Sequence, residues 1–129
     1  MSIKLNYPID IIFEELEFDD CLPSIKFRVD VNVNKFNYKF NYSGELLIDC
    51  SVLDSFIKNL NKGKSSILND MNKKFFIRIN KTSECIKLIW LVKRQDIQGF
   101  LMKSGYKCVI TEDECSLIRK EFNNYSKWW

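Results

Sequence analysis

The sequence predicts an α+β fold, with residues 1–129 forming a single domain. In this prediction an antiparallel sheet of about five to six strands, built from hairpins and meanders, carries two helices on one face. Two stretches between residues 24 and 42 alternate apolar and polar side chains, which is typical of half-buried strands. Two later stretches place apolar residues at helical spacing. A chain of 129 residues is also long enough to bury a substantial core.

The first half of the chain is predicted to begin with hairpin-connected strands. Residues 9–18 form a less regular first strand, and residues 24–34 alternate strictly. A second alternation follows over residues 36–42, so the turn is expected at Asn34-Lys35, where Asn tolerates a positive φ. Ser43-Gly44 is expected to interrupt this strand, which Leu46 to Ile48 then resumes.

A helix of about ten residues is predicted next, capped by Asp49 or Ser51. Asn61-Lys62-Gly63 is expected to end it, with the glycine just past the stop. Its apolar stripe consists of Val52, Leu53, Phe56, Ile57 and Leu60. Residues 64–73 are polar and rich in Lys and Asn, and they are predicted to form a loop.

The second half is predicted to hold two or three strands and a closing helix. Residues 75–79 and 106–110 are short strands, and residues 80–84 form a turn. Cys85 to Lys93 becomes apolar on both faces, which suits a central strand covered on one side by helices. Thr111 and Glu114 form a T-x-x-E capping box at the start of the last helix. The apolar stripe of that helix is Cys115, Ile118, Phe122 and Tyr125.

The composition excludes several kinds of chemistry. The chain contains no His, so Ser-His-Asp catalysis, Cys-His catalysis and His-ligated metal sites are excluded. No phosphate-binding glycine loop occurs, and no pattern organises the carboxylates or cysteines into a catalytic site. We therefore expect no enzymatic activity and no cofactor. The five widely spaced cysteines include no CxxC pair, so we expect reduced, mostly buried thiols.

The beginning of the chain and its hydropathy predict a cytoplasmic protein without a membrane partner. The N-terminal residues lack the apolar segment of a signal peptide. The longest apolar stretches are far shorter than a membrane span.

The net charge of +3 hides an uneven distribution. Residues 1–22 contain six acids and one base, whereas residues 56–107 contain 12 bases and three acids. The acidic stretch has two readings: a solvated edge strand whose charges prevent edge-to-edge pairing, or a surface for a basic protein partner. The terminal tryptophans either fold back on the core or anchor an interface. The predicted partner-facing residues are Glu14, Glu15, Glu17, Asp19, Asp20, Trp128 and Trp129.

The basic stretch supports an alternative function. Lysines interleaved with Phe75, Phe76 and Trp90 could bind single-stranded nucleic acid by stacking and phosphate contacts. The other reading is a solvated lysine face over core aromatics. Sixteen of the 20 basic residues are Lys rather than Arg, which makes a dedicated nucleic-acid reader the less favoured reading.

A segment in the first half resembles small bacterial immunity proteins that neutralise toxins of contact-dependent growth inhibition and WapA-type systems. The resemblance lies in residues 40–46, in Asp49 and in the helix pattern of Leu53, Phe56 and Leu60. It implies stoichiometric binding to the C-terminal domain of a cognate toxin, without catalysis. Members of this group that act against nucleases are often strongly acidic, whereas this chain carries +3. It is therefore expected to use its local acidic region or to offer its basic half to an acidic toxin surface.

Overall fold

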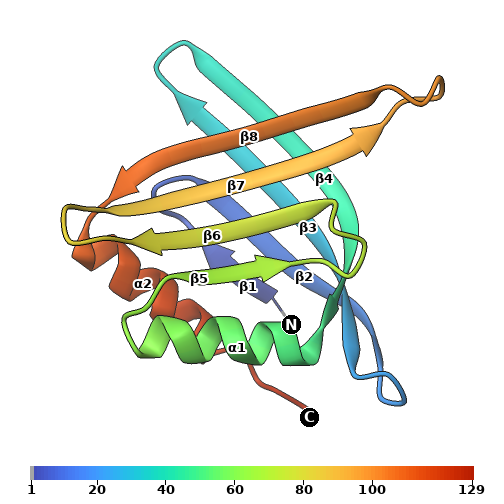
Figure 1. Ribbon diagram of the computed structural model, residues 1–129, viewed down its shortest axis with the longest axis horizontal. Coiled ribbons are helices and arrows are strands. Elements are labelled where there is room, and N and C mark those ends of the chain that lie inside the picture. Colours follow the sequence, from blue (N-terminus) through green and yellow to red (C-terminus); the bar gives the residue numbers. More distant parts are fainter. Residues whose placement is uncertain (1) are drawn as a thin grey trace.

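The computed structural model describes residues 2–129, which form eight strands and two helices (Figure 1). The first half contains β1 (Ser2–Leu5), β2 (Asp10–Asp19), β3 (Ser24–Lys35), β4 (Tyr38–Asp49) and α1 (Cys50–Asn61). The second half contains β5 (Ser66–Asn69), β6 (Phe75–Lys81), β7 (Ile86–Gln95), β8 (Leu101–Ile110) and α2 (Glu112–Asn123).

The strands form two antiparallel sheets of four, in the orders β1-β2-β3-β4 and β5-β6-β7-β8. The α+β class, the single domain, the hairpins and the two helices are confirmed, but the single sheet of five to six strands is wrong. The chain leaves the first sheet through α1, and β5 pairs only with β6. The inner faces of both sheets then meet in one shared hydrophobic core.

The helices close one side of this sandwich instead of covering a face of a sheet. Helix α1 packs against β4 and β5, α2 packs against β1, and the helices contact each other. Figure 1 shows both helices beside β1 and β5, the outermost strands on that side of the two sheets. Within residues 2–129, no helix therefore covers the outer face of either sheet.

The predicted alternation of β3 is confirmed, because Ile25, Phe27, Val29, Val31 and Val33 are all buried. The neighbouring β2 is less regular because its pairing with β3 shifts between Glu15 and Glu17, where Leu16 is the extra residue. Such a bulge bends the strand and changes the direction of the side chains beyond it.

Several predicted boundaries differ from the structure. The tight turn comes at Phe36-Asn37, after Lys35 pairs with Tyr38, so β3 is longer than expected. Strand β4 continues through Ser43-Gly44, since Gly44 pairs with Val29. The predicted loop over residues 64–73 contains β5, β1 was not predicted, and β8 begins five residues before Tyr106. Strands β1 and β5 have four residues each, too short for a clear alternation.

Both predicted helix starts are confirmed by their caps. The Asp49 carboxylate accepts hydrogen bonds from the backbone N–H and hydroxyl of Ser51, at 2.8 and 2.7 Å, which lowers the pKa of Asp49. Thr111 and Glu114 form the reciprocal capping box of α2. Tyr125 lies beyond the end of α2 but is still buried. Neither helix of residues 2–129 has the length and apolar composition needed to cross a bilayer.

Candidate protein-binding surfaces

The acidic stretch and the terminal tryptophans come together at one corner of the molecule. The Phe18 ring at the end of β2 lies against the Trp128 ring, with 4.5 Å between their centroids, and Trp128 packs edge-on against Trp129. Glu17 and Asp20 are exposed beside this aromatic contact. We call the exposed Glu17, Phe18 and Asp20, together with the half-buried Trp128, the acidic corner.

A groove of about 270 Å³ adjoins the acidic corner and mixes apolar with charged side chains. Phe18, Leu22, Leu47 and Met71 line it, and all four are exposed. Exposed apolar side chains beside charges are common in surfaces that bind other proteins.

The C-terminal segment is docked on α1, which is the first of the two readings of the tryptophan pair. The indole N–H of Trp129 donates to Asp54 Oδ2 at 2.8 Å, and Lys127 Nζ lies 2.8 Å from Asp54 Oδ1. Both tryptophans pack against the core and are half-buried. Asp54 thereby holds the chain end next to the β2–β3 turn.

Three of the five predicted acidic contact residues have internal partners. Glu14 lies 4.0 Å from Arg28 on the neighbouring strand. Glu15 accepts a 2.6 Å hydrogen bond from the Tyr125 hydroxyl. Asp19 accepts hydrogen bonds from two backbone N–H groups of the β2–β3 turn. Of the five, only Glu17 and Asp20 have side chains without a hydrogen-bond or ion-pair partner within residues 2–129.

The Tyr125–Glu15 hydrogen bond ties the segment after α2 to β2, and it affects the pH dependence of stability. Burial raises the pKa of Tyr125, and the hydrogen bond to Glu15 and its negative charge raise it further. The folded chain therefore favours the protonated phenol. This contribution is complete below pH about 10, where the unfolded tyrosine keeps its proton, and it is lost as the pH rises above that value.

Replacing Tyr125 by Phe is expected to lower the free energy of unfolding by about 1–3 kcal/mol at neutral pH, because the half-buried Glu15 carboxylate loses its donor. Urea unfolding at pH 7 and pH 11 measures this effect. The difference between the two proteins should shrink at pH 11, where the wild type loses its tyrosine contribution. An unchanged stability at neutral pH would contradict a structural role for the bond.

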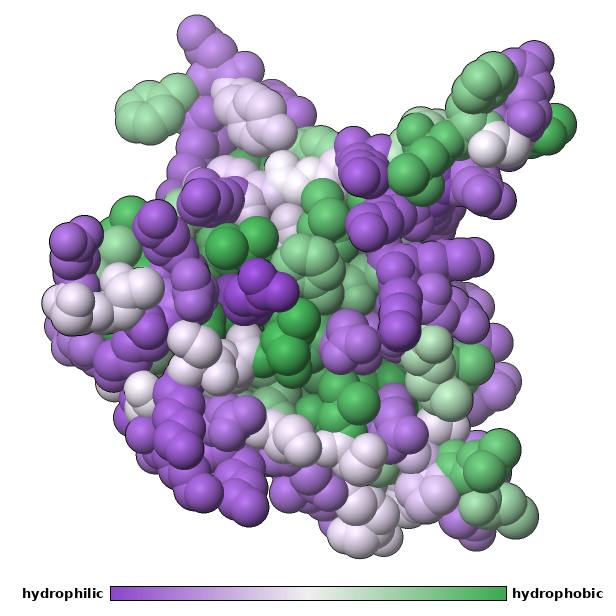
Figure 2. Space-filling view, in the orientation of Figure 1, coloured by the Kyte–Doolittle hydropathy of each residue, from purple (hydrophilic) through white to green (hydrophobic). Residues whose placement is uncertain are grey.

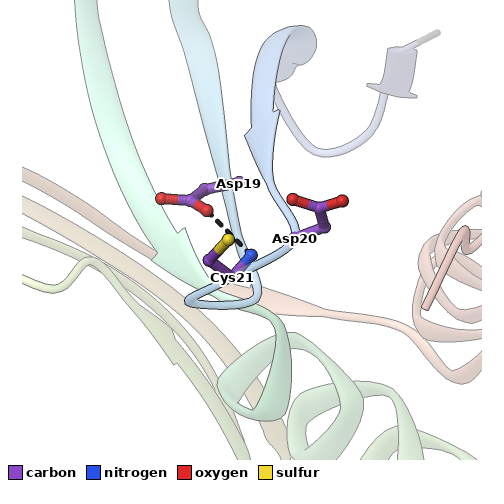
Figure 3. Close-up of side chains that lie close together, drawn as sticks. All are labelled: Asp19, Asp20 and Cys21. Atoms are coloured by element: carbon purple, nitrogen blue, oxygen red, sulfur yellow. Dashed lines mark hydrogen bonds between the residues drawn. The ribbon is translucent and has the colours of Figure 1, made fainter.

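The β2–β3 turn also gathers Asp19, Asp20 and Cys21, whose ligand atoms lie within 4.8 Å of one another (Figure 3). All three side chains are exposed, and Asp19 is engaged in the turn. The cluster by itself therefore does not indicate a metal site.

The prediction of mostly buried cysteines holds in part: Cys50 and Cys115 are buried, but Cys21 is exposed. Burial raises the pKa of Cys50 to about 11, with help from nearby carboxylates.

The second surface is the outer face of β5–β8. Its cations belong to the basic stretch of residues 56–107, but its apolar centre was not predicted from the sequence. Its centre is apolar, and the residues in register across the strands place the side chains in rows. The apolar members are Ile67, Phe76, Ile89, Leu91 and Val109, and the surrounding cations are Arg78, Lys87, Lys93, Lys103 and Lys107. The outward-facing positions of these four strands hold no acidic residue. We call this surface the cationic face.

Figure 2 views the cationic face and shows apolar side chains over the middle of the sheet with hydrophilic ones around them. Gly105 keeps this face flat, because a Cβ there would lie 2.9 Å from the Trp90 carbonyl oxygen and 3.1 Å from Leu91 Cδ1. The Arg78 guanidinium lies 5.3 Å from the centroid of the Phe76 ring. An aliphatic centre, one aromatic ring and five cations therefore share one open surface.

The signal for this surface was present in the sequence as the two-sided apolar pattern of β7. That pattern predicted a central strand covered on one side by helices. The central position is confirmed, because β7 lies between β6 and β8, but the helical cover is wrong, because no helix of residues 2–129 lies over the outer side of β7. The aromatics proposed for base stacking separate as well. Phe75 and Trp90 are buried in the core, and only Phe76 reaches the outer face.

Comparisons with known proteins return no matching family model, no matching curated protein and no matching solved structure.

Proposed function

We propose that this chain is a protein-binding inhibitor, the immunity protein of a toxin–immunity pair, which acts by stoichiometric binding and without catalysis. The observation that carries the proposal is the cationic face, an uncovered side of a four-stranded sheet with an aliphatic centre and five cations. A partner that covers exposed apolar surface of this kind removes it from water, and this favours binding.

The charges of the cationic face indicate the kind of partner. Opposite charges across an interface accelerate association and select the correct partner. A toxin domain that binds here would carry an apolar centre and a rim of Asp and Glu. This supports contact between the basic half of the chain and an acidic toxin surface, which is one of the two contact modes expected for an immunity protein with a net positive charge.

Base stacking is poorly supported on the same face. Single-stranded nucleic acid is held by aromatic side chains on which successive bases stack. The cationic face offers one half-buried ring, Phe76, which the Arg78 guanidinium already approaches. Aliphatic side chains such as Ile89 and Leu91 favour a protein partner instead.

The acidic corner is the proposed second contact. It lies beside the β2–β3 turn and joins Glu17 and Asp20 to the exposed Phe18 ring. The acids on the outer face of the first sheet are partly balanced by bases of β3, since Lys26 lies 3.5 Å from Glu45 and Arg28 lies 4.0 Å from Glu14. The acidic charge of the first sheet is therefore more nearly balanced by bases than the sequence of residues 1–22 alone suggests.

The test uses the C-terminal domain encoded by the reading frame immediately upstream. Co-expression with the wild-type chain should protect the cell and give a 1:1 complex. The double variant Arg78→Glu/Lys107→Glu should weaken binding about 10- to 100-fold, because it opposes the acids of the partner. Isothermal titration calorimetry at two salt concentrations measures the loss.

The control is Lys4→Glu, which reverses one exposed lysine of the first sheet and should leave the affinity unchanged. Absence of both protection and a complex would refute the proposal. A complex that survives Arg78→Glu/Lys107→Glu but is lost in Glu17→Lys/Asp20→Lys would move the toxin site to the acidic corner. Tight binding of a single-stranded oligonucleotide with a steep salt dependence would favour nucleic acid as the ligand.

A further inference from the structure

Two turns project from the edge of the molecule away from the helices, one at each end of that edge (Figure 1). One is the β3–β4 turn at Phe36-Asn37, and the other is the β7–β8 turn over residues 96–100. Phe36 and Ile97 are fully exposed, at 102% and 106% of their reference areas. Tyr38, Phe100, Leu101 and Met102 beside them are also more than half exposed. Figure 2 shows apolar side chains on both projections.

The backbone conformation of Phe36 destabilises the fold. Its φ is 54°, in the left-handed region that favours glycine and is rarely adopted by bulky residues. Its side chain is fully exposed, so it gains nothing from the core. A strained residue that does not stabilise the fold points to a role outside it.

The β7–β8 turn holds its apolar side chains in a defined arrangement. The Asp96 carboxylate accepts hydrogen bonds from the backbone N–H groups of Gln98 and Phe100, each at 2.9 Å. The Asp96 N–H donates to the Phe100 carbonyl, and Gly99 takes a φ of 85°. The one acid of the turn is thus directed to the backbone.

Cations surround both turns. Lys35 and Lys39 flank the first, and Arg94 and Lys103 flank the second. A groove of about 710 Å³ opens beside the β7–β8 turn and is lined by Lys73, Lys74, Lys93 and Arg94, with Glu45 and Asp96 as its acids. Glu45 pairs with Lys26, and Asp96 accepts hydrogen bonds within its own turn. The four cations of the groove therefore remain available to bind anionic groups.

We propose that this edge binds the surface of an anionic lipid bilayer, with the Phe36 and β7–β8 turns inserted among the lipids and the neighbouring cations on the phosphates. A bilayer accepts apolar turns that lie at one edge without requiring shaped pockets, and aromatic rings are favoured at its interface. Anionic headgroups attract each nearby lysine or arginine. This goes beyond the proposed inhibition, and it differs from the expectation of no membrane partner in proposing contact with the bilayer surface.

The test is sedimentation of the full chain with large unilamellar vesicles, in the absence of any toxin. Vesicles of equal parts phosphatidylglycerol and phosphatidylcholine should bind the chain, and pure phosphatidylcholine should bind it at least tenfold more weakly. Binding to the anionic vesicles should fall as salt rises. Phe36→Gly and Ile97→Ser/Phe100→Ser should each reduce the partition coefficient about tenfold or more, through lost apolar contact.

Phe36→Gly separates binding from folding, because glycine suits the left-handed turn and the variant should melt no lower than the wild type. Leu117→Ser is the matched control, since Leu117 is half exposed on α2, away from both turns. The proposal is overturned if the anionic vesicles leave the chain in solution, or if Phe36→Gly and Ile97→Ser/Phe100→Ser sediment like the wild type. Loss of toxin binding in these variants, without any vesicle binding, would assign the turns to a protein interface.

Discussion

Replacing Phe13 by Ala is expected to lower the free energy of unfolding by about 3–5 kcal/mol. Phe13 lies on β2 with 0% of its side chain exposed. Its ring centroid lies 5.9 Å from that of Phe27 on β3, 6.3 Å from that of Phe75 on β6, and 6.0 Å from that of Phe122 on α2. One side chain therefore joins both sheets to the closing helix, and its loss leaves a cavity that none of them can fill alone.

Urea unfolding followed by tryptophan fluorescence measures this loss. Domains of this size have total stabilities of about 5–15 kcal/mol, so the loss is a large fraction of the total and should lower the urea midpoint clearly. Phe100→Ala is the control, because it removes the same ring from an exposed turn and should change stability by less than about 0.5 kcal/mol. A loss below about 1 kcal/mol for Phe13→Ala would mean that the two sheets do not share the core described above.

Asp70→Ala is expected to cost about 2–4 kcal/mol, a large effect for a single polar side chain in a turn. Asp70 is 3% exposed, and its Oδ1 accepts hydrogen bonds from the backbone N–H groups of Lys74 and Phe75, at 2.7 and 3.0 Å. Lys73 takes a φ of 56° within this β5–β6 turn. Alanine would leave two backbone donors without a partner, one of them in a buried part of the chain.

The turn also connects the two sheets, because the Met71 N–H donates to the Leu47 carbonyl of β4 at 2.8 Å. Because the N–H groups of Lys74 and Phe75 lose their acceptor in Asp70→Ala, native-state hydrogen exchange should show faster exchange at both residues. Asp70→Asn serves as the control, since its amide oxygen can still accept both hydrogen bonds and should restore most of the stability. Equal losses in the two variants would show that the negative charge, and not the acceptor, is required.

Local patterns in the chain were sufficient to predict the secondary structure at its strongest points. The strict alternation from Ser24 to Asn34 and the capping box of Thr111 and Glu114 depend on neighbours within four residues, and both are confirmed. The same holds for the Asp49 cap and for the glycine after α1, whose φ is 68°. These features follow from backbone hydrogen bonding and side-chain periodicity.

Charge was harder to predict than secondary structure, because its effect depends on which strands are neighbours. The acidic stretch of β2 lies next to Lys26 and Arg28 of β3, and Glu15 turns inward to Tyr125. The basic stretch, by contrast, gathers five cations on one face of β5–β8 without an acid among them. The sequence pointed to the acidic N-terminal stretch as the contact surface, whereas the most one-sided charge of the folded chain lies on the second sheet.

The chain's order of residues was thus enough to establish an α+β domain with hairpins, two capped helices and no histidine chemistry. Tertiary structure alone decided that the strands divide into two sheets, that Trp128 contacts Phe18, and that no element of residues 2–129 covers the outer side of β7. The physical reason is that periodicity records only whether a side chain is apolar. It does not record whether the cover for an apolar face comes from the same chain or from a partner, because that depends on contacts between residues far apart in the sequence.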